Sequence, residues 1–109
     1  MPSNLPESDW KKLSRLKPLA LDRLCARILQ EASSIIARAR AGEHHRAYLD
    51  LYRHIHKSDE ILGNCFDDWS RSQALVVLIN WREQNLLTED EFALFSAETQ
   101  ALVDGWLKG

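Results

Sequence analysis

The sequence lacks the features that mark exported, membrane-spanning or zinc-binding chains. Its two cysteines, Cys25 and Cys65, lie far apart without CxxC or Cys/His spacing, so we expect two reduced, half-buried thiols and no metal site. The longest uninterrupted apolar run, residues 74–79, is much shorter than the roughly 20 residues that span a bilayer. The first residues carry no apolar segment of the kind found in secretion signals. These absences predict a cytoplasmic protein with no membrane contact.

The common catalytic signatures are also missing. The sequence contains no GxGxxG, GxxxxGK[ST], HExxH or GxSxG, the patterns typical of dinucleotide, phosphate, zinc-protease and hydrolase sites. Its serine pairs, Ser33-Ser34 and Ser70/Ser72, have no marked histidine or aspartate partners. We therefore expect a protein that is not an enzyme, with no catalytic residue and no cofactor.

The composition is that of one globular domain with an uneven charge. The chain has 109 residues, of which 45% are hydrophobic and 28% are charged. Residues 1–57 hold eleven lysines and arginines against six carboxylates, a formal charge of +5. Residues 58–109 hold three against ten, a formal charge of −7. Opposite charges on the two halves predict attraction within the fold or between protomers.

Apolar residues recur every three or four positions along most of the chain, which is typical of helices. The predicted helical segments, separated by short turns, are 18–41, 43–66, 67–87 and 88–109. Ser70 with Gln73, and Thr88 with Glu91, have the spacing of a capping box, and Ser96 has the position of a further cap. The sequence predicts an all-α fold, a single small helical bundle of four to five helices.

Two prolines suggest a boundary near the beginning of the chain. Pro6 and Pro18 bracket a short segment, so residues 1–17 are predicted to form an N-terminal arm or a short docking helix. Docking is favoured, because an arm would leave Trp10 in water. Residues 18–109 are then the helical bundle domain.

The stretch HIHKSDE, residues 54–60, is the densest group of reactive side chains. On a helix, His54 and His56 point about 200° apart, so they cannot bind one metal ion. His54 and Lys57 are predicted to face water. Asp59 falls on the apolar arc of the same segment and should need a buried partner.

The third predicted helix offers that partner. If the chain turns at residues 64–66, antiparallel pairing sets Asp59 opposite Arg71. The sequence therefore predicts a structural buried ion pair between Asp59 and Arg71. The alternative is that the two residues form a pocket for a small anionic ligand.

Basic residues suggest a second kind of surface. Within residues 11–57, a possible basic face consists of Arg23, Arg27, Arg38, Arg46, Arg53 and Lys57. Such a face could bind nucleic acid. However, Glu31 and Asp50 interrupt it, and the pI of about 6.1 lies well below the values above 9 that are typical of nucleic-acid-binding domains. A nucleic-acid-binding regulator is therefore an alternative function.

Four tryptophans are many for this length, and tryptophan is enriched at interaction hot spots. A possible partner surface consists of Trp81, Trp10 and Trp106. Trp81 is favoured because it lies away from the side that carries Leu75 and Ile79. The predicted function is a non-catalytic helical interaction module that binds a protein partner or itself, with a two-fold dimer as one form.

The segment WREQNLLTEDEF resembles the hairpin of SHOCT, the short C-terminal domain, in which leucines precede a turn and a T-E-E-E-F-like sequence. The resemblance covers residues 75–92, and the ALFSAET that follows departs from the lysine-rich second helix of that family. It implies an oligomerisation or docking hairpin, with its turn formed by Leu86, Leu87, Thr88, Glu91 and Phe92. The whole chain also resembles small uncharacterised bacterial all-α proteins, and this implies no activity.

Overall fold

The computed structural model describes residues 5–109 and confirms the all-α fold. The helices of this part of the chain are α1 (Glu7–Ala37), α2 (His44–Phe66), the 3-10 helix η1 (Arg71–Gln73), α3 (Ala74–Glu83), α4 (Glu89–Phe92) and α5 (Ala97–Lys108). No strand occurs in residues 5–109.

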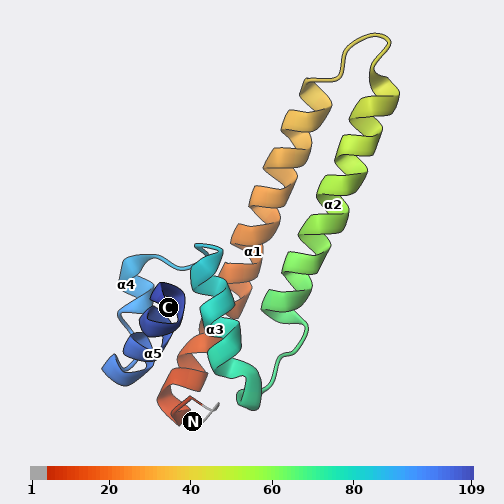
Figure 1. Ribbon diagram of the computed structural model, residues 1–109. Helices are drawn as coiled ribbons and strands as arrows, with labels where there is room; N and C mark the ends of the chain where they lie inside the picture. Colours follow the sequence, from red (N-terminus) through yellow and green to blue (C-terminus); the bar gives the residue numbers. More distant parts are fainter. Residues whose placement is uncertain (1–4) are drawn as a thin grey trace.

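The molecule has two regions, which we name the base and the hairpin. In the base, α3, α4 and α5 gather around the first half of α1 (Figure 1). The second half of α1 and most of α2 extend from the base as an antiparallel pair, the hairpin, which gives the molecule dimensions of 55 × 26 × 24 Å. Only two helices form the hairpin, so each has one neighbour in the chain.

The predicted boundary between residues 17 and 18 is wrong, because α1 continues through Pro18. A proline inside a helix removes one backbone hydrogen bond. The helix persists because one face is buried on both sides of the proline, through Leu13 before it and Ala20 and Leu24 after it. Residues 5–17 are therefore docked as part of the base.

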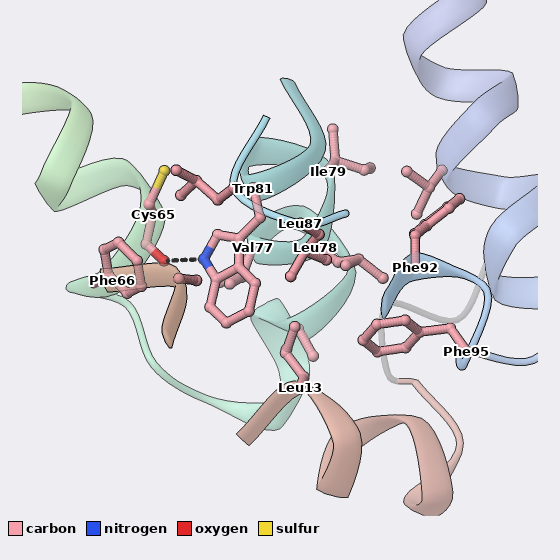
Figure 2. Close-up of a cluster of buried hydrophobic side chains, with 14 of the residues drawn as sticks. Leu13, Cys65, Phe66, Val77, Leu78, Ile79, Trp81, Leu87, Phe92 and Phe95 are labelled. Carbon is pink, nitrogen blue, oxygen red and sulfur yellow. Dashed lines mark hydrogen bonds between the residues drawn. The ribbon is translucent and has the colours of Figure 1, made fainter. Parts of the chain in front are cut away.

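The core of the base is built around α3, whose sequence is apolar on nearly every side. Trp81 is fully buried, and its indole Nε1 donates a hydrogen bond to the carbonyl oxygen of Cys65 over 2.9 Å (Figure 2). The phenyl ring of Phe66 lies 5.6 Å from the Trp81 ring, centroid to centroid. Phe92 and Phe95 close the opposite side of the cluster (Figure 2).

The caps of the last two helices confirm the sequence predictions, whereas the first predicted capping box is wrong. Thr88 and Glu91 each bond the other's backbone N–H, and the hydroxyl of Ser96 accepts from the N–H of Thr99. Ser70 instead makes no cap, and its hydroxyl lies 3.2 Å from that of Ser72. The chain there first forms η1, so α3 begins only at Ala74.

Candidate interaction surface

The predicted buried ion pair between Asp59 and Arg71 is not formed. Asp59 is exposed on the hairpin. Arg71 lies in the base, where its guanidinium pairs with Glu7 of α1 and lies 3.5 Å from the carbonyl oxygen of Leu5. An anionic-ligand pocket built from Asp59 and Arg71 is excluded for the same reason.

The pair was wrongly predicted because α2 is rotated about its own axis relative to the orientation that the sequence predicts. The side chains that face α1 are spaced by four and three residues and are mostly small or polar: Ala47, Leu51, His54, Ser58, Ile61 and Cys65. His54 was predicted to face water, but its Nε2 lies 2.9 Å from the carbonyl oxygen of Ile28. The more apolar stripe of α2 lies one residue further along, rotated by about 100° from this seam.

That rotation leaves large hydrophobic side chains in water on one side of the hairpin. We name this side the apolar face, and its most exposed members are Leu29, Ile36, Tyr48, Tyr52 and Ile55. A shallow groove joins the two helices along it, with Leu29 and Cys25 from α1 opposite Ile55 and Leu62 from α2. Asp59 lies at the edge of this groove. Helical spacing puts Ile36, Tyr48 and Tyr52 on the same side.

The opposite side of the hairpin carries charges of both signs. Arg27 and Lys57 line one cavity on it together with Glu31, and Arg38 and Arg46 line another near the tip together with Glu43 and Asp50. Arg27 also donates to the carbonyl oxygen of Gln84, over 2.7 Å. The structure thus brings four of the six predicted basic residues to one side.

The other two predicted basic residues are engaged elsewhere. Arg53 lies at the outer edge of α2, 3.6 Å from the carboxylate of Asp50. Arg23 belongs to the base, where its two terminal nitrogens bond both carboxylate oxygens of Glu91 over 2.6 and 3.0 Å. The same guanidinium donates to the carbonyl oxygen of Leu86 over 2.8 Å.

The prediction that Trp81 contributes to a partner surface is wrong, because α3 is enclosed by α1, α2 and α5. Trp10 is half-buried, with its ring 5.4 Å from that of Trp69, which in turn lies 5.9 Å from Trp81. Of the three predicted residues only Trp106, 71% exposed near the end of α5, is open to a partner. Helix α5, which carries Trp106, lies in the base and not in the hairpin (Figure 1).

Sequence reasoning missed the most important buried carboxylate, Asp9. It is fully buried and accepts hydrogen bonds from the backbone N–H of Ser96, its hydroxyl and the hydroxyl of Thr99, over 3.0, 2.7 and 2.6 Å. Burial acts to raise the pKa of Asp9, but the bonds from Thr99 and Ser96 outweigh it and lower that pKa below its usual value. The available signal was spacing, since Asp9 shares a helical face with Leu13 and Ala20.

The capping residue Glu91 has a second role that its spacing could not reveal. Its bidentate bond with Arg23 joins α4 to α1 across 68 residues of chain. The hydrogen bond from Arg23 lowers the pKa of Glu91 to about 2, and the backbone bond from Thr88 acts in the same direction. The buried Asp9 and the half-buried Glu91 therefore both join helices of the base.

The remaining reactive groups are isolated. Among residues 5–109, no three His, Cys, Asp or Glu side chains lie close enough together to hold a metal ion. His56 lies 3.9 Å from Glu60, and both are exposed. Burial, with a smaller contribution from Glu83, raises the pKa of the Cys65 thiol to about 11.

No helix in the described part of the chain has the length and apolar character needed to cross a membrane.

Comparisons of the chain with protein-family models, curated proteins and solved structures found no match. The resemblance of residues 75–92 to SHOCT therefore stays a prediction. In the structure this segment forms α3, a turn and the single-turn helix α4. Leu86, Leu87 and Phe92 are buried in the chain's own core, so these three side chains offer no docking surface.

Proposed function

We propose that the protein is a non-catalytic interaction module whose apolar face binds a protein partner or a second copy of the chain. One observation carries the proposal: five large hydrophobic side chains, from 45% to 67% exposed, gather on one side of the hairpin. Single exposed hydrophobic residues are common on soluble proteins, but a contiguous stripe of them is typical of a binding surface. The two helices of the hairpin extend beyond the other helices of the chain (Figure 1).

The chemistry of the base supports a non-catalytic role. Asp9 and Glu91 are both saturated by hydrogen bonds from residues of the fold, and their pKa values are lowered, as for structural carboxylates. The pKa of Cys65 is raised, which is the opposite of what activates a thiol nucleophile.

Nucleic-acid binding is a second candidate function, because four of the six residues of the predicted basic face lie on the side of the hairpin opposite the apolar face. Arg27 and Lys57 share one cavity there with Glu31, and Arg38 and Arg46 share another with Glu43 and Asp50. If these residues contact phosphates, affinity for RNA or DNA should fall steeply as salt rises. Lys57→Ala and Arg46→Ala should each weaken binding and flatten that salt dependence, and a chain that binds no nucleic acid at low salt contradicts this candidate.

The experiment for the main proposal is site-specific photocrosslinking in the cells that make the protein. Tyr52→benzoylphenylalanine places a photoreactive group on the apolar face, and Ser34→benzoylphenylalanine places the same group on the opposite side of α1. We expect a protein adduct from position 52 that Ile55→Glu in the same chain abolishes, and no such adduct from position 34. Equal adduct yields from both positions, or none from position 52, would contradict the proposal.

A further inference from the structure

We infer that the occupant of the apolar face is a second copy of this chain, docked with its hairpin antiparallel to the first about a two-fold axis. The two hairpins then form a four-helix bundle. This inference rests on the proposed function and names the partner for the same surface.

The hairpin has the construction of half a bundle. In a four-helix bundle each helix needs two apolar stripes, one for each neighbour, at spacings of three and four residues. The hairpin uses one stripe of each helix for its own seam. The second stripes, spaced in the same way, are Cys25, Leu29 and Ile36 on α1, with the small and already buried Ala32 between the last two, and Tyr48, Tyr52, Ile55, Asp59 and Leu62 on α2. A second hairpin is the simplest structure that fills both of these stripes at once.

The order of side chains along α2 fits a two-fold axis. If the axis passes between residues 53 and 54, Tyr52 of one copy lies level with Ile55 of the other, and Tyr48 lies level with Asp59. Tyr48 and Asp59 are about 16 Å apart along the helix, so the pairing occurs twice, once at each end. The phenol of tyrosine donates a hydrogen bond that a carboxylate accepts. Asp59 is exposed in the single chain, and dimerisation would give it a hydrogen-bond donor.

The charges of the hairpin select the antiparallel arrangement. The tip, residues 38–46, holds three arginines against one glutamate, a formal charge of +2, together with His44 and His45. Residues 59–68, at the opposite end of α2, hold four carboxylates and no lysine or arginine, a formal charge of −4. An antiparallel dimer sets the tip of each copy beside the acidic end of the other. A parallel dimer would set tip beside tip, where like charges repel.

The area of the apolar face is near what a stable dimer needs. Two helices over about 20 residues cover roughly 30 Å by 20 Å, or on the order of 600 Å². A standard interface buries roughly 800 Å² on each partner. Contacts between the rest of each tip and the acidic end of the other copy would add to this area.

Sedimentation equilibrium with a matched pair of variants tests the inference. Ile55→Glu and Ser34→Glu each add one negative charge to an exposed helical position, on opposite sides of the hairpin. We expect the wild-type chain and Ser34→Glu to dimerise equally well, and the dissociation constant of Ile55→Glu to rise by at least about 30-fold, as for a hot-spot residue. Circular dichroism checks that each variant keeps its helices, and Tyr52→Ser is a second variant expected to weaken the dimer.

Disulfide trapping tests the orientation. In a Cys25→Ser background, chains carrying Tyr48→Cys are mixed with chains carrying Asp59→Cys and exposed to oxidised glutathione. We expect the mixed disulfide between positions 48 and 59 and little product from Tyr48→Cys alone, because only residues that lie close together can be bridged. Rapid linking of position 48 to itself would overturn the antiparallel arrangement.

A wild-type chain that stays monomeric up to about 1 mM would overturn the inference. If the photoreactive group at position 52 then attaches to a different protein, the second copy is the wrong occupant and the proposed function stands. If the photoreactive group attaches to no protein, both this inference and the proposed function are wrong.

Discussion

Trp81, at the centre of the base, is fully buried, whereas Tyr52, midway along the hairpin, is 60% exposed. The contrast occurs even within α1, where Leu13 and Leu24 are buried but Leu29 and Ile36 are not. The hydrophobicity of these side chains does not differ enough to explain their different exposure. The number of neighbouring helices explains it, because α1 is covered by several helices in the base and by α2 alone in the hairpin (Figure 1).

The polar contacts of the two regions differ in the same way. In the base, Asp9 joins α1 to the start of α5, and Arg23 joins α1 to Glu91, so each contact links segments far apart in sequence. In the hairpin, the contact between His54 and the carbonyl oxygen of Ile28 is the principal polar link between α1 and α2 among residues 5–109. The core of the base is therefore completed within one chain, although Val76, Leu94 and Trp106 stay exposed on its surface. The apolar face of the hairpin is left uncovered.

The largest expected contrast comes from deleting one aromatic side chain in each region. Trp81→Ala should destabilise the protein by about 4 kcal/mol, because it opens a cavity in the core and removes the hydrogen bond to Cys65. Tyr52→Ala should change the free energy of unfolding of the monomer by less than about 0.5 kcal/mol. Urea unfolding of dilute protein measures both, and equal losses would break the distinction between base and hairpin.

Two aspartates give the next contrast. Asp9→Ala should cost about 3 kcal/mol, because it removes the carboxylate that accepts from the N–H and hydroxyl of Ser96 and from the hydroxyl of the buried Thr99. Asp59→Ala should cost less than about 0.5 kcal/mol in the monomer, since that carboxylate is exposed. The same unfolding measurement applies. A large loss from Asp59→Ala at low protein concentration would show that the carboxylate is engaged within its own chain.

Acid should weaken the base. The pKa of Glu91 is lowered from 4.5 to about 2, so its contribution to stability is fully present above pH 4.5 and is lost as the pH falls toward 2. Asp9 acts in the same direction. The loss through Glu91 should be about 2 kcal/mol, allowing for solvent screening of its partly exposed partner Arg23. Unfolding across this pH range measures it, and Glu91→Gln should flatten the curve; an unchanged slope in that variant would contradict the assignment.

The smallest effect concerns Ile55→Glu, which should change the stability of the monomer by no more than about 0.5 kcal/mol. Its consequence should appear only at high concentration. If two copies associate, the melting temperature of the wild-type chain rises with protein concentration and that of Ile55→Glu does not. Melting curves at several concentrations check this, and parallel behaviour of the two chains would argue against association through the apolar face.

The sequence predicted well those features that depend on residues close together in the chain. The Thr88–Glu91 capping box and the Ser96 cap depend on residues three positions apart, and the apolar spacing of the helices is likewise local. A helix break at Pro18 was wrongly predicted, because the backbone hydrogen bond that the proline removes is offset by the burial of apolar side chains on both sides of it. The partner of Arg71 is Glu7, which lies far away in the sequence, so no local spacing could indicate it.

The candidate surface was missed for a related reason. Helix α2 carries two stripes with the same spacing, one through His54 and Ser58 and one through Tyr52 and Ile55. A rule that buries the more apolar stripe assigns Tyr52 and Ile55 to the core and places Asp59 there with them. In the structure the stripe through His54 and Ser58 faces α1, and the more apolar stripe stays outside. Hydrophobicity alone does not distinguish a stripe buried within the chain from one buried by a second chain.

Backbone hydrogen exchange at two protein concentrations tests this division of the molecule most directly. Amides of α3 in the base should exchange only through global unfolding. The free energy of opening measured for them should be close to the free energy of unfolding at any protein concentration. Amides of α2 between Tyr48 and Asp59 should exchange through local opening in dilute protein and become more protected as the concentration rises. Hairpin amides that are as protected as those of α3 in dilute solution, with no response to concentration, would contradict the account.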